Sequence, residues 1–136
     1  MNKNIKEDIS KMEARNKIEI FAQQNKKFKF SGHTITKALA IADYLNFLGF
    51  KITDAFPGEH DNILISAYDE FIDYNIDIDP DNSYMLELEQ HNRSETSKAE
   101  KYEYKAIYEE YGLTIEQLWY KLYKFKIIED LEETTI

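Results

Sequence analysis

Hydrophobic positions recur with a helical period in two segments near the start of the chain. From Ile5 to Gln24, apolar residues lie near one face of a helix, with Lys and Glu between them. A second helix is predicted from Thr34 to Leu48, and Gly49 follows it where a left-handed residue commonly ends a helix. Residues 25–32, between the two, are predicted to form a short edge strand or an extended loop. The apolar stripe of the second helix is Ile35, Ala38, Leu39, Ala42, Leu45 and Leu48.

The strictest alternation of apolar and polar residues lies between positions 72 and 90. Apolar side chains alternate with acidic or amide side chains on both sides of the segment 80–83, whose sequence Pro-Asp-Asn-Ser is typical of a turn. We therefore predict a β-hairpin over 72–90 with one half-buried face. The side chains expected to face the core are Ile72, Tyr74, Ile76, Ile78, Tyr84, Leu86 and Leu88.

The segments before this hairpin are less regular. A strand is predicted from Phe50 to Phe56, ended by Pro57 and Gly58. Residues 59–72 fit two patterns. Ile63, Leu64, Ala67, Tyr68 and Phe71 fit a helix, whereas Ile63, Ile65 and Ala67 fit a strand. We favour the helix, because Glu59 and Asp61 would suit its positive N-terminal end.

The last third of the sequence predicts two further helices. Residues 90–97 are polar and are expected to form a loop, and a helix is predicted from Ser97 to Tyr111. Thr114 and Gln117 have the spacing of a capping box, which predicts a final helix from Ile115 to Leu131. The whole pattern predicts an α+β fold with about four helices packed with a small antiparallel sheet containing the 72–90 hairpin. At 136 residues, 1–136 is expected to be a single domain.

Charge is distributed unevenly along this acidic chain, whose net charge is −9. Residues 1–51 carry ten Lys or Arg against five Asp or Glu, whereas residues 52–97 carry one Arg against twelve acids. The negative total opposes general affinity for nucleic acid or for an anionic membrane. The sequence has no Cys, no apolar stretch long enough to span a bilayer and no signal-peptide pattern at its start. We therefore expect a cytoplasmic protein without a membrane partner.

The first candidate site is the acidic face of the predicted hairpin. Residues two apart on a strand lie roughly 6.6 Å apart, a spacing comparable to that of successive phosphates on a nucleic-acid strand. The face could therefore occupy the nucleic-acid-binding groove of a partner protein, or it could simply keep the sheet soluble and prevent edge-to-edge association. Its polar residues are Asp73, Asn75, Asp77, Asp79, Glu87 and Glu89.

The second candidate site is a concentration of aromatic residues between 102 and 125. They could form the seam between the last two helices, or a surface for a partner or for a second copy of the chain. Tyr102, Tyr120 and Tyr123 do not all fit one seam, so we assign these three to partner binding. The full set is Tyr102, Tyr104, Tyr108, Tyr111, Trp119, Tyr120, Tyr123 and Phe125.

Residues 108–124 also resemble a helix-turn-helix around Gly112, with the Lys-rich first third of the chain available for phosphate contacts. Little positive charge lies on the second of these helices, so an ordinary pair of antiparallel helices is favoured over a DNA-binding regulator.

Catalytic and metal-binding chemistry find little support in the sequence. His33, His60 and His91 are scattered among polar segments, and no known catalytic or phosphate-binding motif is present. The acidic run beginning at Asp77 departs from a calcium loop, because its sixth position is Asn82 and its twelfth is Leu88. We therefore expect no catalytic residues, no metal and no cofactor. A small enzyme without a familiar motif would instead require a pocket containing a residue with a strongly shifted pKa.

These observations favour a non-enzymatic protein that binds, and by doing so inhibits, a protein with a basic surface. At the level of charge and size, the chain is similar to the acidic inhibitors that mobile elements use against nucleases, including anti-CRISPR and anti-restriction proteins. Toxin-neutralising immunity proteins share this physical description. A helix-turn-helix-like regulator is the alternative from a different class.

Overall fold

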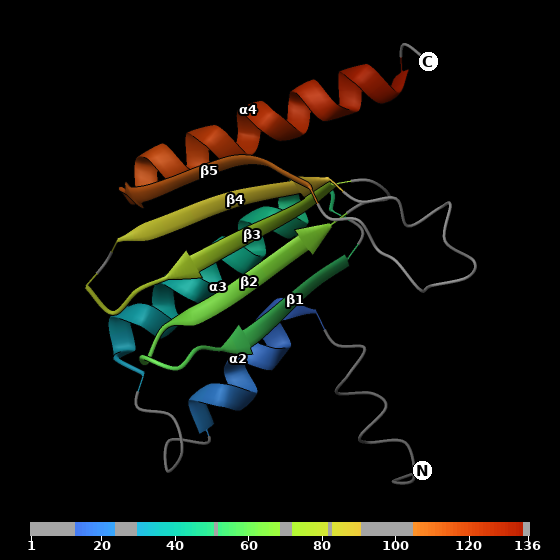
Figure 1. Cartoon of the computed structure of the whole chain (residues 1–136). Coiled ribbons are helices and arrows are strands. Elements are labelled where there is room, and N and C mark those ends of the chain that lie inside the picture. The colour runs from blue at the N-terminus through green and yellow to red at the C-terminus, as the bar shows by residue number, and fades with distance from the viewer. Residues whose placement is uncertain are drawn as a thin grey trace, which may run out of the picture.

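The computed structural model describes residues 13–23, 30–50, 52–68, 72–81, 83–90 and 105–134. These ranges form three helices and one five-stranded antiparallel sheet, so the predicted α+β class is confirmed. The strands lie side by side in sequence order, each antiparallel to the next (Figure 1). They are β1 (Ile52–Pro57), β2 (Ile63–Tyr68), β3 (Ile72–Ile78), β4 (Tyr84–Gln90) and β5 (Lys105–Leu113).

The three helices lie on one side of this sheet (Figure 1). Helix α2 (Ala14–Gln23) packs beside β1, and α3 (Gly32–Phe47) crosses the middle strands. Helix α4 (Ile115–Thr134) follows β5 directly and runs along that end of the sheet, where it also contacts α3. The core is therefore the layer between the helices and the inward side chains of the strands. None of the helices within the described ranges is long and apolar enough to cross a membrane.

The predicted 72–90 hairpin is confirmed in position and in orientation. Ile76 of β3 lies opposite Leu86 of β4, and Tyr74 lies opposite Leu88. Six of the seven side chains expected in the core are buried, and Ile72 packs against the core at its edge. The strict alternation was a reliable signal because the two faces of this sheet meet different environments, protein on one side and solvent on the other.

The sequence signals at two helix ends, Gly49 after α3 and the capping box before α4, are also confirmed. Ser31 caps α3 by accepting a hydrogen bond from the Thr34 backbone N–H, and Gly49 follows the helix with φ of +93°. At the start of α4, the Thr114 N–H donates to Gln117 Oε1 at 2.9 Å, and the Gln117 N–H donates to Thr114 Oγ1 at 3.2 Å. This is the reciprocal capping box that the spacing predicted. Helix α2 agrees with the predicted first helix, whose residues 5–12 and 24 lie outside the described residues, as do 25–29.

The helix predicted over 59–72 is wrong, because this segment contains strand β2. Ile63, Ile65 and Ala67 are fully buried, and β2 is paired on both sides, with β1 and with β3. Glu59 and Asp61 lie in the preceding turn rather than at a helix N-terminus. The local pattern fitted both periods, and pairing with two neighbouring strands decided between them.

The helix predicted over 97–111 is also wrong where the structure describes it, because 105–113 is strand β5. Its pairing with β4 contains two register irregularities, and these break the two-residue period. For that reason, the spacing of Ile107, Tyr108 and Tyr111 in the sequence matched the period of a helix. Residues 108–124 therefore form a strand, a turn and a helix. Both the helix-turn-helix and the antiparallel helix pair predicted there are wrong. Residues 91–104, which include the predicted 90–97 loop, lie outside the described residues.

A candidate acidic binding face

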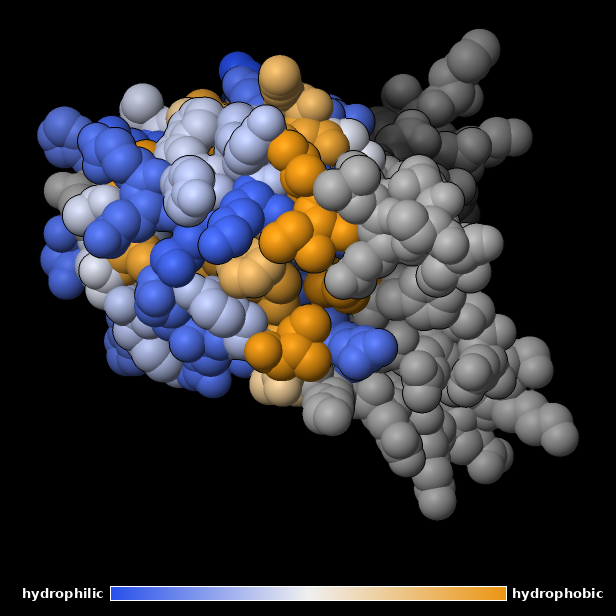
Figure 2. All heavy atoms as spheres, turned by 90° about the horizontal axis from the view of Figure 1, so that it is seen from above, coloured by the Kyte–Doolittle hydropathy of each residue, from blue (hydrophilic) through white to orange (hydrophobic). Residues whose placement is uncertain are grey.

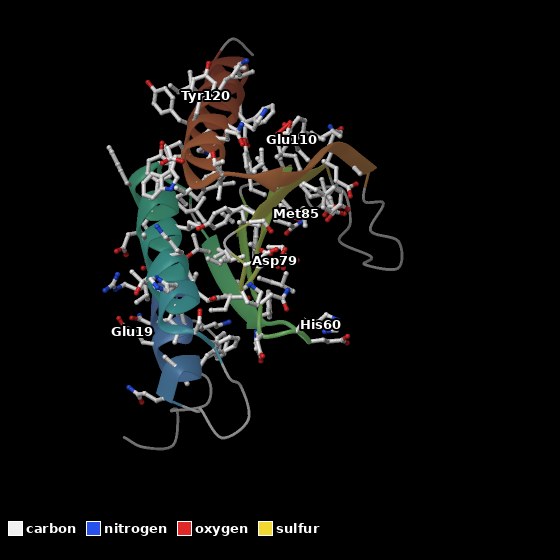
Figure 3. The ribbon with its side chains drawn as sticks, turned by 90° about the vertical axis from the view of Figure 1, so that its left-hand side faces the viewer. Glu19, His60, Asp79, Met85, Glu110 and Tyr120 are labelled. Carbon is white, nitrogen blue, oxygen red and sulfur yellow. The ribbon has the colours of Figure 1, made fainter. Side chains whose placement is uncertain are left out.

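The side of the sheet opposite the helices carries a group of acidic residues, which we call the acidic face. Alternate residues of each strand point to this side, and the strand register places their neighbours across the strands. Figure 3 shows the helices on one side of the sheet and Met85, which belongs to the acidic-face side of β4, on the other. The acids of this face are Asp54, Asp73, Asp77, Glu87, Glu89 and Glu109.

Two pairs of these acids lie directly opposite each other on neighbouring strands. Asp73 of β3 is the register partner of Glu89, and Glu87 of β4 is the register partner of Glu109. Like charges at directly opposed positions destabilise a sheet, because their side chains are only about 4.5–5.5 Å apart at Cβ. The opposed charges of Glu87 and Glu109 are therefore expected to lower the stability of the isolated sheet.

Amide side chains hold the carboxylates in place without neutralising them. Asn75 donates from Nδ2 to Glu89 Oε1 at 2.8 Å and to Glu87 Oε1 at 3.2 Å, while its Oδ1 accepts from the Ser66 hydroxyl at 2.8 Å. Asn62 Nδ2 donates to Asp77 Oδ1 at 2.7 Å. These bonds orient the carboxylates and leave the net charge of the face unchanged.

Repulsion between neighbouring carboxylates contributes to a raised pKa of Glu89. Partial burial raises this pKa first, and the neighbouring carboxylates of Glu87 and Asp73 raise it further. Within the described ranges, no Lys or Arg forms an ion pair with Asp77, Glu87 or Glu89. In the same ranges, Lys17 of α2 forms an ion pair with Asp54 of β1 at the edge of the sheet. Among the described residues, the carboxylates of Asp77, Glu87 and Glu89 thus keep negative charge that no Lys or Arg pairs.

The turn between β3 and β4 extends the acidic surface. Burial raises the pKa of Asp79, and the nearby Asp77 and Asp81 carboxylates raise it further. By contrast, hydrogen bonds from the Ser83 hydroxyl and backbone N–H lower the pKa of Asp81. Asp79 directly follows the last residue of β3, so it lies at the end of the acidic face, where it is half-buried.

The other predicted site residues differ in burial and in the surface on which they lie. Asp73 points to the acidic face but only 7% of its surface is exposed, so it is a poor candidate for direct contact with a partner. Tyr120 and Tyr123 are exposed on α4, and Figure 3 shows Tyr120 projecting from that helix, away from the sheet. Tyr102 lies outside the described residues. The structure thus places the acids and the two described tyrosines on separate surfaces.

Sequence reasoning missed Glu109 and Asp54 as members of the acidic face. Glu109 was missed because its segment was assigned to a helix, although Ile107, Tyr108 and Tyr111 are residue types that favour strands. Asp54 lies in the predicted 50–56 strand, but its side could not be known before the pairing of β1 with β2 was known.

A second feature is an open hollow of about 540 Å³ where the starts of α3 and α4 meet the turn after β3. His33, Lys37 and Glu116 line it, together with Tyr84 and Thr114. Across the described part of the chain, no group of three or more His, Cys, Asp or Glu residues could hold a metal ion. The hollow therefore presents polar groups but no assembled metal site in that part.

Comparison of the chain with protein-family models, with curated proteins and with solved structures finds no match.

Proposed function

We propose that this chain is a non-enzymatic acidic protein that binds, and thereby inhibits, a protein with a basic nucleic-acid-binding surface. The observation that carries the proposal is the directly opposed pair of carboxylates formed by Glu87 of β4 and Glu109 of β5. A sheet that only needed to stay soluble could alternate Lys and Glu across its strands and gain stability. Retained like-charge pairs are better explained by a partner whose cations relieve the repulsion.

The spacing of the carboxylates supports the same proposal. Acids two residues apart on β4, such as Glu87 and Glu89, lie roughly 6.6 Å apart along the strand. Glu109 continues the row onto β5, and Asp77 continues it onto β3. A surface that binds phosphates through Lys and Arg would meet negative charge at comparable intervals. Such an interaction is expected to associate rapidly at low salt and to weaken as salt rises.

The experiment is an affinity capture from lysate of the native host with three baits. The first bait is the wild type, and the second carries Asp77→Asn, Glu87→Gln, Glu89→Gln and Glu109→Gln. The matched control removes four exposed acids elsewhere, through Glu19→Gln, Asp43→Asn, Glu59→Gln and Asp61→Asn. Both variants therefore change the net charge equally, and only one changes the acidic face.

The proposal expects a nucleic-acid-binding protein that the wild type and the control retain and the acidic-face variant loses. Duplex DNA added in excess should displace the chain from that protein, because the two would share one surface. Equal capture by all three baits would overturn the role of the acidic face. Capture of a toxin whose activity is unrelated to nucleic acid would favour an immunity protein, and co-purification of nucleic acid alone would favour a regulator.

A further inference from the structure

The exposed side of α4 carries aromatic and apolar side chains that the acidic face does not explain. Tyr120 is 63% exposed and Tyr123 is 50% exposed, and Ile127 follows them along the same side of the helix. Phe47, at the end of α3, is 73% exposed. Figure 2, which looks down on the α4 side, shows a band of hydrophobic side chains beside hydrophilic ones. We call Phe47, Tyr120, Tyr123 and Ile127 the α4 patch.

The α4 patch lies next to a cluster of packed aromatic rings. Tyr44 of α3 packs against Trp119 with ring centroids 4.2 Å apart, and Phe47 meets Tyr44 edge-to-face at 6.2 Å. Burial raises the pKa of Tyr44, and the charge of Tyr123 adds to this. The exposed rings therefore project from a packed layer formed by two helices. Such rigid aromatic residues lose little conformational entropy when a partner covers them.

Charged residues border the patch in a self-complementary arrangement. Glu116 and Lys124 lie four residues before and four residues after Tyr120, and all three are exposed. Four residues advance about 6 Å along a helix and turn about 40° beyond one full turn. Glu116 and Lys124 are thus displaced equally from Tyr120, in opposite directions along the helix and around it. Within the described ranges, neither of them forms an ion pair inside the chain.

We infer that α4 is a homodimerisation surface, with the twofold axis passing through Tyr120. A twofold rotation about that axis brings Glu116 of one copy opposite Lys124 of the other, and the reverse pair forms at the same time. The two Tyr120 rings meet at the centre. The two α4 helices overlap over residues 115–125, so Ile127 and the acidic positions 130, 132 and 133 lie beyond the helix-to-helix overlap. The inference does not rest on the proposed function.

The placement of charge elsewhere on the molecule agrees with a second copy as the occupant. The chain has net charge −9, and two such chains repel each other unless their contact avoids the acids. The acidic face lies on the other side of the sheet from the helices, whereas the exposed surface of α4 between 116 and 124 carries one acid and two lysines. A dimer through α4 would leave both acidic faces uncovered.

The test uses charge reversal at the two bordering positions and measures the association state by sedimentation equilibrium. Glu116→Lys places two like pairs in the dimer, because both symmetric contacts change, and Lys124→Glu does the same with the opposite sign. Each single variant is expected to raise the dimer dissociation constant roughly tenfold or more. An equimolar mixture of the two variants should form heterodimers, since both contacts then become attractive. The double variant Glu116→Lys with Lys124→Glu should dimerise like the wild type.

Three controls separate this inference from simple damage to the fold. Glu59→Lys changes the charge as much as Glu116→Lys but lies in the turn before β2, and it should leave the dimer unchanged. Tyr120→Glu should give a monomer whose circular dichroism and thermal melt still show a folded chain. A wild type that stays monomeric at its highest soluble concentration would overturn the inference. A dimer that ignores both charge reversals would overturn the assignment to α4. The acidic-face variant should still dimerise, so this inference and the proposed function can fail separately.

Discussion

Glu87 of β4 and Glu109 of β5 lie directly opposite each other on the side of the sheet that faces away from the helices, as register partners in an antiparallel pair. The Tyr111 hydroxyl donates a hydrogen bond to Glu109, and Asn75 donates one to Glu87. Both carboxylates are therefore held in place by neutral donors while their charges remain opposed. This relationship links the stability of the sheet to its proposed role, because whatever relieves the repulsion stabilises the fold.

We expect Glu109→Gln to stabilise the isolated protein. The substitution keeps an acceptor oxygen for the Tyr111 hydroxyl and removes one of the two opposed charges. The gain should be a few tenths of a kcal/mol up to about 1 kcal/mol at low salt, and it should shrink as salt screens the pair. Urea denaturation at two salt concentrations measures both effects. Glu59→Gln, in the turn before β2, is the matched control and should change neither.

The pKa of Glu89 predicts a definite pH dependence of stability. Its folded-state pKa is raised by burial and by Glu87 and Asp73, so between the unfolded and folded pKa values the folded chain binds more protons. This residue therefore destabilises the fold above its folded pKa, and the penalty disappears as the pH falls through that value. We expect Glu89→Gln to be more stable than the wild type at neutral pH, by a margin that shrinks as the solution is acidified. A margin that stays constant with pH would contradict the assignment to Glu89.

Gly49 and Gly32 provide a matched pair of glycine substitutions at the two ends of α3. Both have open space where a Cβ would be added, but only Gly49 has a positive φ, at +93°. Gly49→Ala should therefore destabilise the chain by about 1–2 kcal/mol, because a side chain is strained in that backbone conformation. Gly32→Ala should be neutral or slightly stabilising. Thermal unfolding of the two variants compares them directly, and equal effects would contradict the explanation.

The capping box at the start of α4 should be required for full stability. Thr114→Ala removes the acceptor for the Gln117 N–H, and we expect a loss of about 0.5–2 kcal/mol. Thr114→Ser keeps that acceptor and should lose much less. Denaturant unfolding of both variants tests the prediction. If the two substitutions cost the same, the hydroxyl of residue 114 has no capping role.

The local signals in the sequence determined those elements whose two sides meet different surroundings. The 72–90 hairpin is half-buried along its whole length, so its period of two was unambiguous. The caps at Gly49 and Thr114 involve neighbours only one to four residues away, so their chemistry could be recognised in the sequence. The orientation of Asp77, Glu87 and Glu89 followed from the hairpin alone.

Only the tertiary structure decided the elements that depend on partners distant in the sequence. Residues 63–68 fitted both a helix and a strand, the helix was favoured, and pairing with β1 and β3 made them a strand. Residues 105–113 imitated a helix because irregular pairing with β4 displaced their side chains from strict alternation. The same pairing added Glu109 to the acidic face and left Tyr120 and Tyr123 on a surface of their own. The physical reason is that strand hydrogen bonds join distant segments, whereas helix caps and turns are completed within a few residues.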